Sequence, residues 1–204
     1  MKIKHIITVL TFALSLSINT TAQSPATGNI NGHDYVDLGL SVLWATCNVG
    51  AVNPYNPGDH FAWGEVKTKA NYNSSKSETY GKSQYVFRDA ATYNWGNSWR
   101  MPTKAECQEL VDNCTWQWTA IGDHKGHRVT SKKNGNSIFL PAAGYSYNTM
   151  TFIGVEWGYY WSSSPYESSS NGAYSLNAGS GGHGIGWDGR YNGESIRPVA
   201  DKIE

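Results

Sequence analysis

The sequence lacks any long hydrophobic segment after its first 22 residues. The one apolar run, residues 6–18, would span about 20 Å as a helix, short of the roughly 30 Å hydrocarbon core of a bilayer. Basic residues precede this run, and small Thr20 and Ala22 follow it, which is typical of a secretory signal peptide. We therefore predict a signal peptide over residues 1–22. The mature protein is expected to be exported (secreted, at the cell surface or in the periplasm) and not inserted in a membrane.

An excess of charge of one sign is also missing. The chain has 16 Lys and Arg against 16 Asp and Glu, and loss of Lys2 and Lys4 with the signal peptide leaves a slight acidic excess. No basic patch or run of like charges stands out along the chain. This argues against nucleic acid or an anionic membrane surface as the main partner.

Cysteine is scarce, with only Cys47, Cys107 and Cys114. An odd number in an exported protein leaves at least one without an intramolecular partner. Cys107 and Cys114 lie on one predicted helix with about 10.5 Å of rise between them, beyond the Cα separation of about 7 Å that a disulfide allows. Feasible disulfides therefore join Cys47 to one of these two. The expected pair is Cys47–Cys114, with Cys107 as a buried thiol.

Clusters of catalytic or metal-binding residues are missing as well. The carboxylates show no pairing that would mark a glycosidase site: Glu65, Glu106, Glu156 and Asp188. His124 and His127 offer two imidazoles in a turn, but nothing fixes a third or fourth metal ligand. We therefore predict no metal, no cofactor and no enzymatic activity. A metal-dependent enzyme remains the alternative.

Aromatic and small polar residues are abundant instead. The chain has 13 Tyr, 9 Trp and 22 Gly, with many Ser and Asn and few aliphatic residues. Tyr and Trp offer large contact areas with a polar tip, while Ser, Gly and Asn adapt their hydrogen bonding. This mixture is typical of binding surfaces. The alternative is that the aromatic residues fill the core of a loop-rich domain.

One clear helix is predicted from residue 104 to about residue 114. Thr103 and Glu106 form a capping box, which satisfies two free backbone donors of the first turn. Apolar residues then recur at helical spacing and form a single stripe: Cys107, Leu110, Val111 and Cys114. Residues 88–95 are predicted to form a shorter helix.

Short strands are predicted on both sides of these helices. Two lie around Gly39, a hairpin turns at Asn134-Gly135, and four more lie between residues 158 and 199. The order of these elements is strands, then one or two helices, then more strands. This order predicts one α+β domain over residues 33–200. A disordered linker at 23–32 would precede it, and a tail at 201–204 would follow.

Six sequence blocks, in order, resemble the Fibrobacter succinogenes major paralogous domain. They are DYVDLGLSVLWA at 34–45, FAWGE at 61–65, WRMPTKAE at 99–106, NSIFLPAAG at 136–144, YWSS at 160–163 and SIRPV at 195–199. The resemblance implies a C-type-lectin-like fold with long loops, in which one main helix and a short one pack on small antiparallel sheets. It also implies that the terminal strands pair, with residues 35–38 near 196–199.

The same resemblance extends distantly to formylglycine-generating enzymes. Those enzymes use cysteines late in the domain, and this chain has none after Cys114. Because the nucleophile is missing, their chemistry is not implied. Cys107 stands where such domains usually carry an aromatic residue, which indicates a core thiol.

The candidate binding site is the C-terminal segment, residues 159–192. Its aromatic, amide and charged side chains are interspersed with Ser and Gly: Tyr166, Asn171, Tyr174, Asn177, His183, Trp187, Asp188, Arg190, Tyr191 and Asn192. The segment resembles the variable end of C-type-lectin-like proteins diversified by retroelements. Because side chains of a strand alternate, half of these residues are alternatively core residues.

These observations predict an exported, non-enzymatic recognition or adhesion module. It would bind a glycan or a protein surface outside the cytoplasm through the aromatic C-terminal segment. Besides the enzyme, the remaining alternative is a structural subunit of a surface layer or fimbria.

Overall fold

The computed structural model describes residues 23–153 and 156–202, so the predicted signal peptide at 1–22 lies outside the described residues. The helices are α1 (Ala90–Trp95), α2 (Lys104–Asn113) and the 3-10 turn η1 (Ser74–Lys76). In chain order the strands are β1 (Gly28–Ile30), β2 (His33–Val36), β3 (Val42–Ala45), β4 (Phe61–Ala62), β5 (Cys114–Ile121), β6 (His124–Ser131), β7 (Ser137–Pro141), β8 (Tyr145–Tyr147), β9 (Met150–Phe152), β10 (Trp157–Pro165), β11 (Gly172–Gly179), β12 (Gly182–Gly189), β13 (Gly193–Glu194) and β14 (Val199–Asp201).

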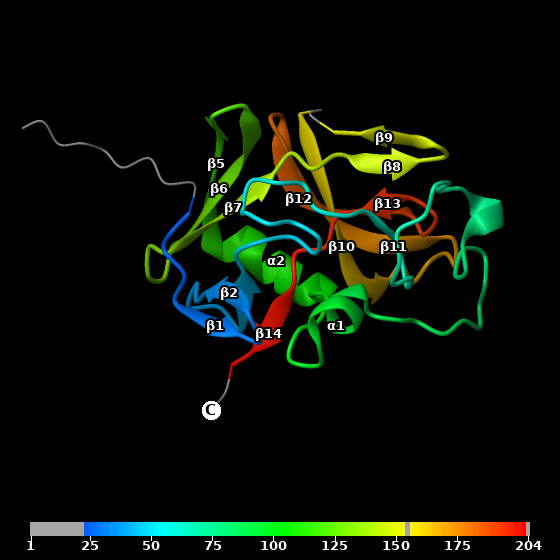
Figure 1. Ribbon diagram of the computed structural model, residues 1–204, viewed down its shortest axis with the longest axis horizontal. Helices are drawn as coiled ribbons and strands as arrows, with labels where there is room; N and C mark the ends of the chain where they lie inside the picture. Colours follow the sequence, from blue (N-terminus) through cyan, green and yellow to red (C-terminus); the bar gives the residue numbers. More distant parts are fainter. Residues whose placement is uncertain (1–22, 154–155, 203–204) are drawn as a thin grey trace, which may run out of the picture.

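The strands form four small sheets around α2 (Figure 1). Their strand orders are β1-β2-β3-β14, β5-β6-β7, β4-β13-β8-β9 and β10-β11-β12. Figure 1 shows the first sheet below α2 and the β8–β9 hairpin on the opposite side of the molecule. The β8–β9 hairpin therefore lies far from the terminal sheet, β1-β2-β3-β14, on the side of the molecule that holds the candidate site.

The first and last strands of the described chain share one sheet. β14 pairs antiparallel with β3, with Val199 opposite Trp44, and β3 pairs on its other side with β2. The predicted pairing of the terminal strands is therefore wrong: they share a sheet, but β3 lies between β2 and β14. β14 ends at Asp201, the first residue of the predicted tail.

The residues that precede β2 pack onto the domain. The Ser24 amide donates to the Ser137 carbonyl (2.9 Å), and β1 pairs with β2, with Gly28 opposite Tyr35. The structure therefore differs from the predicted disordered linker at 23–32. β1 and β2 form a hairpin whose two-residue turn is Asn31-Gly32, a local signal that the prediction missed. Only the partner of Ser24, in β7, lies far away in the sequence.

Helix α2 begins where its capping box predicts. The Glu106 amide donates to Thr103 Oγ1 (3.2 Å), and the Thr103 amide donates to Glu106 Oε2 (2.7 Å). Arg100 pairs with Glu106 and with Asp201 of β14, at 2.6 Å each. The sequence-predicted helix start is confirmed, and its cap also ties α2 to the terminal sheet.

The main core surrounds α2. Leu110 of the helix packs with Val36, Val129 and Leu176, which come from β2, β6 and β11. The helix also contacts β10, β11 and β12, so one face of that sheet is turned toward it. Within residues 23–153 and 156–202, no helix has the length and hydrophobicity to span a bilayer.

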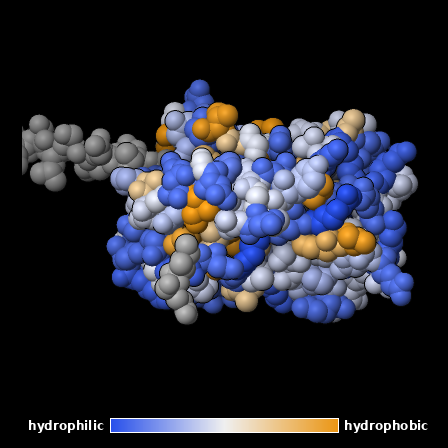
Figure 2. All heavy atoms as spheres, turned by 60° about the horizontal axis from the view of Figure 1, so that its bottom comes forward, coloured by the Kyte–Doolittle hydropathy of each residue, from blue (hydrophilic) through white to orange (hydrophobic). Residues whose placement is uncertain are grey.

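One face of the surface is mostly hydrophilic. Figure 2 shows hydrophobic residues there only as small, separate patches among polar ones. Large contiguous apolar patches usually mark permanent protein interfaces. This face therefore does not have the character of such an interface.

The three cysteines are free thiols, so the predicted Cys47–Cys114 disulfide is wrong. Cys114 lies in the main core at the start of β5, whereas Cys47 is half-buried beyond the end of β3. Cys107 is buried, as predicted, and burial raises the pKa of its thiol. Helix spacing excluded a Cys107–Cys114 disulfide. It gives no information on the distance between Cys47 and Cys114, which lie far apart in the sequence.

The predicted α+β, C-type-lectin-like fold class is also wrong. Strands hold 42% and helices 11% of the structure, in four small antiparallel sheets with one substantial helix, α2. The prediction undercounted strands because it treated β1, β8 and β9 as linker or loop. These strands are only three residues each, too short for a period-two pattern to stand out.

Candidate functional site

The β10–β11–β12 sheet turns one face to the core and the other to a cleft. Leu176 lies opposite Ile185 in the register, and both pack in the main core. Neighbouring residues of a strand point to opposite faces, so Asn177 and Asp188 belong to the second face. Tyr159 of β10 lies opposite Asn177 and shares that face. The alternation therefore divides the predicted site residues between two surfaces.

A cleft of about 350 Å³ lies on the second face, lined by residues of β8, of the β10–β11–β12 sheet and of the loop after β12. Its lining residues are Tyr145, Tyr147, Tyr159, Asp188 and Asn192. We call this surface the tyrosine cleft. Three aromatic rings beside a carboxyl and an amide make it a mixed apolar and polar site, as small-ligand sites usually are.

A glycine positions the hairpin that borders the tyrosine cleft. Gly144 has φ of +68°, and a Cβ on it would lie 1.5 Å from the carbonyl oxygen of Phe152. Only glycine fits this close approach in the left-handed region. Tyr145 then pairs with Phe152, and their rings stack with centroids 4.9 Å apart. The first ring of the cleft is therefore held by the backbone beside it.

The tyrosine rings are packed together yet remain accessible. Tyr145 meets Tyr159 edge to face at 5.4 Å, and Trp157 lies 6.3 Å beyond Tyr159. Tyr147 contacts Tyr191 at 6.0 Å. Tyr147 is 39% exposed and Trp157 is 37% exposed, large fractions for such side chains. A ligand can therefore reach rings whose orientation is already fixed.

Acidic and amide groups form the deep end of the tyrosine cleft. Asp188 Oδ1 accepts from the Gly189 amide (2.6 Å) and from Asn192 Nδ2 (2.7 Å). Glu194 stands behind Asp188 and is 0% exposed. Burial and then the Asp188 carboxyl hold the pKa of Glu194 well above its ordinary value, and burial also raises the pKa of Asp188. The two carboxyls therefore disfavour each other's charge.

The core-side face of the same sheet ends in a second aromatic surface. Tyr166 stacks on Trp187 with centroids 4.9 Å apart and an interplanar angle of 7°, and it meets Tyr174 edge to face at 5.4 Å. Lys104 Nζ, at the start of α2, lies 3.6 Å above the Tyr174 ring. Trp187 is 54% exposed. We call Tyr166, Tyr174 and Trp187 the aromatic ledge.

Two predicted site residues belong to the scaffold behind these surfaces. Arg190 is buried, donates to the Gly172 carbonyl (2.8 Å), and lies 4.6 Å from the centroid of the Trp63 ring. Its amide donates to the carbonyl of Asn171 (2.9 Å), whose side chain is exposed in the loop before β11. Arg190 therefore orders that loop and is not available to a ligand.

His183 lies on neither surface. It is exposed and stacks on Trp116 of β5, with ring centroids 4.4 Å apart. His127 lies 5.8 Å away and contacts the Gly179 carbonyl through Nε2 (2.9 Å). Across the described residues, no three His, Cys, Asp or Glu side chains gather as a set of metal ligands.

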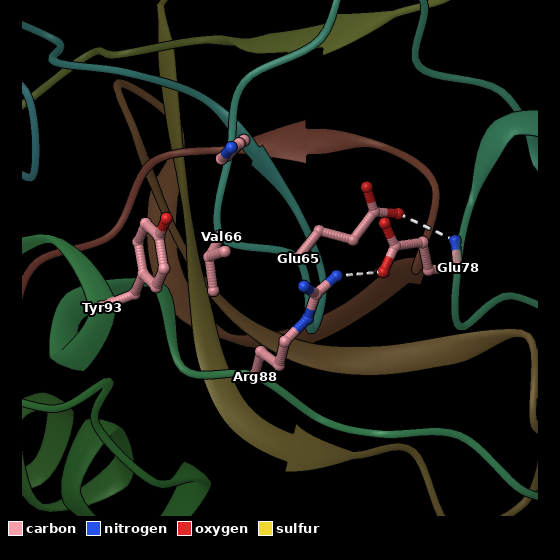
Figure 3. A pocket seen from close by; sticks show the side chains of 6 residues that line it. Glu65, Val66, Glu78, Arg88 and Tyr93 are labelled. Carbon is pink, nitrogen blue, oxygen red and sulfur yellow. Dashed lines mark hydrogen bonds and ion pairs between the residues drawn. The ribbon is translucent and has the colours of Figure 1, made fainter.

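A third hollow, of about 330 Å³, lies beside the loop that follows β4 (Figure 3). Glu78 pairs with Arg88 there, while Glu65 accepts from the Glu78 amide (2.9 Å) and pairs with Lys69. Figure 3 shows Tyr93 across the hollow from these charged groups. Because its carboxylates already have partners, this hollow is a weaker candidate than the tyrosine cleft.

The model of one protein family, the Lcl C-terminal domain, matches residues 35–200. The chain belongs to the Lcl C-terminal domain family. The matched span contains the tyrosine cleft and the aromatic ledge, so both surfaces are part of the Lcl C-terminal domain. Comparisons with curated proteins and with solved structures gave no match.

Within this Lcl C-terminal domain, the sequence prediction found Asp188, Asn192 and the neighbouring Tyr191. It missed Tyr145 and Tyr147, and also Tyr159 and Glu194. The alternation of two tyrosines in Gly-Tyr-Ser-Tyr was the available signal, because residues two apart in a strand share a face. That signal is short, and it lies well before the segment that the prediction considered.

Proposed function

We propose that this protein is an exported, non-enzymatic recognition or adhesion module that binds a glycan in the tyrosine cleft. The observation that carries the proposal is the cleft itself, where accessible tyrosine rings stand beside Asp188 and Asn192. Aromatic rings bury the apolar faces of sugars, while carboxyl and amide oxygens accept from sugar hydroxyls. A cavity of about 350 Å³ suits a small number of sugar units.

Membership of the Lcl C-terminal domain family supports a surface or extracellular setting for this module. The predicted signal peptide at 1–22 points the same way. We also propose that the domain is related to the Fibrobacter succinogenes major paralogous domain. The varied residues 166–192 would then have been diversified by a retroelement.

The arrangement of carboxyls favours binding over glycoside hydrolysis. A glycosidase needs two carboxyl groups that both reach the sugar, on opposite sides of the scissile bond. In the tyrosine cleft only Asp188 lines the cavity, because Glu194 is fully buried behind it. The proposed module therefore retains its ligand unchanged.

The aromatic ledge is the second candidate surface for the same kind of ligand. Its outer ring, Trp187, is exposed and held parallel to Tyr166, so a sugar ring can stack on it without reordering the side chains. The ledge lies on the opposite face of the sheet from the tyrosine cleft. The two surfaces can therefore be tested separately.

A glycan array on the purified domain, followed by calorimetry with the best ligand, tests the proposal. Tyr147→Ala removes an accessible cleft ring, and Trp187→Ala is the matched change on the ledge. We expect Tyr147→Ala to weaken binding about tenfold or more and Trp187→Ala to leave it unchanged. Thermal melting of each variant shows that it still folds.

The outcomes separate the candidate functions. Retention of no glycan, or binding that Tyr147→Ala does not alter, overturns the proposal. Loss with Trp187→Ala alone moves the site to the aromatic ledge. Capture of a protein ligand with no glycan, or concentration-dependent self-assembly in sedimentation, favours the protein-binding or structural-subunit alternatives.

A further inference from the structure

The deep end of the tyrosine cleft holds acceptors for which the described residues supply no donor. Both carboxyl oxygens of Glu194 are buried without a hydrogen-bond donor, and so is Oδ1 of Asn192, a residue only 7% exposed that lines the cavity. An acceptor buried without a donor loses its hydrogen bonds to water with nothing in return, which destabilises the folded state, and more so when the acceptor is charged. Three such oxygens beside one cavity indicate a missing donor.

The nearby donors are already used. Asn192 Nδ2 and the Gly189 amide both donate to Asp188 Oδ1. Ser175 lies close to Glu194, but its hydroxyl donates to Asn177 Oδ1 (2.8 Å). None of the ion pairs among the described residues includes Asp188 or Glu194. The carboxyl pair can share the proton that Glu194 holds when no ligand is bound, but no donor of the described residues reaches Asn192 Oδ1, which lines the cavity. That oxygen needs a donor from outside the described chain.

The surroundings select a cationic donor. Tyr145, Tyr147 and Tyr159 line the same cavity as Asp188, and the faces of aromatic rings attract cations. An ammonium group carries three N–H donors and no acceptor, so it complements a floor made of acceptors. Its positive charge also offsets the unfavourable proximity of the two carboxyls.

We propose that the tyrosine cleft binds a protonated primary amine, so that its glycan contains an amino sugar with a free amino group. The inference deepens the proposed glycan-binding function and rests on it. The amine donates to the Asp188 carboxylate and to Asn192 Oδ1, while Glu194 lies buried behind Asp188. N-acetylation removes both the charge and two of the donors, so the acetylated sugar does not fit this floor.

Titration calorimetry of the mature domain with two matched trisaccharides tests the inference. The trimer of glucosamine and the trimer of N-acetylglucosamine differ only at the nitrogen. We expect the glucosamine trimer to bind at least tenfold more tightly at pH 6 and physiological salt. Asp188→Asn is expected to remove that preference, because hydrogen bonds to charged groups are worth about a tenfold change or more.

Glu167→Gln is the matched control, because it removes an exposed carboxylate that hydrogen-bonds Tyr174 on the aromatic ledge. It is expected to leave the preference intact. A loss of preference in this control would show a diffuse charge effect and overturn the inference. Melting curves identify any variant that fails to fold. Asn192→Leu, which removes the unpaired Oδ1 acceptor at similar volume, then serves as the second variant and should also lose the preference for the amine.

The remaining outcomes keep this inference distinct from the proposed function. Equal binding of both trimers, weakened by Tyr147→Ala, overturns the amine and leaves a glycan-binding cleft. No binding of any glycan overturns both. Binding of N-α-acetyl-lysine amide without the glucosamine trimer, or stabilisation by Ca²⁺ alone, shows that another cation occupies the floor and also overturns the amino-sugar inference.

Discussion

The carboxyl group of Glu194 is fully buried and lies against that of Asp188. Two buried carboxylates in contact repel each other, so one holds a proton when no cation is bound. Glu194 is the more buried of the two and is the one that holds it. The pair therefore makes both stability and ligand binding depend on pH.

The first prediction concerns stability against pH without ligand. The pKa of Glu194 is raised in the folded state, so between about 4.3, its unfolded value, and the raised value the native state binds more protons. The stabilising contribution is present below that window and is lost as the pH rises through it. We expect the melting temperature of wild type relative to Glu194→Gln to fall as the pH rises above about 4.3.

The comparison with Glu194→Gln isolates the titration of the Glu194–Asp188 pair. Asp188, Tyr159 and Ser175 face Glu194, and they are common to both proteins. Burial lowers the pKa of His60 and of His127, which gives the opposite slope, but both histidines are common to the two proteins as well. Two parallel curves of melting temperature against pH would contradict a neutral Glu194.

The second prediction concerns the cysteines. Burial raises the pKa of the Cys107 thiol and raises that of Cys114 to about 11, so both react slowly with thiol reagents in the folded state. Cys47 is half-buried and should react first. We expect one thiol to titrate in the native protein and three after denaturation. Two protons fewer in the intact mass, or a melting temperature that falls with reductant, would instead reveal a disulfide.

The helix shows how far local sequence determines structure here. Its capping box and its apolar stripe involve residues within a few positions of one another, so the sequence alone predicted α2. The linker prediction missed a local signal, the Asn31-Gly32 turn of the β1–β2 hairpin. The disulfide depended on the distance between remote positions, and that prediction differs from the structure. Local patterns contain no such distances.

The candidate site shows the same limit. Residues 166–192 were predicted to form one binding surface, but only Trp187 of their Tyr and Trp side chains is largely exposed, and the register of β11 and β12 sends Trp187 and Asp188 to opposite faces. The other half of the tyrosine cleft comes from β8, which approaches through tertiary packing. A contiguous segment therefore could not represent one binding surface.

The third prediction concerns the cap of α2. Thr103→Ala removes the acceptor for the Glu106 amide and should lower the free energy of unfolding by about 1 kcal/mol. Urea unfolding monitored by circular dichroism measures the change. Ser168→Ala, an exposed hydroxyl in the loop before β11, is the control and should lie within about 0.5 kcal/mol of wild type. Equal losses in the two variants would show that the capping box contributes nothing.

The fourth prediction separates backbone strain from close approach at the tyrosine cleft. Gly135 and Gly144 both have positive φ, 76° and 68°, so alanine at either position costs about 1 kcal/mol of backbone strain. A Cβ on Gly135 meets nothing within 4 Å, whereas one on Gly144 lies 1.5 Å from the Phe152 carbonyl oxygen.

Gly144→Ala must therefore push β9 away from the turn and displace Tyr145, while Gly135→Ala leaves its surroundings in place. We expect Gly144→Ala to lower the melting temperature further than Gly135→Ala and to weaken glycan binding about tenfold, with no loss in Gly135→Ala. Melting curves and calorimetry on both variants measure this. Equal effects on stability together with unaltered binding would show that the hairpin tolerates the displacement, and that Tyr145 is not held in the cleft by its backbone.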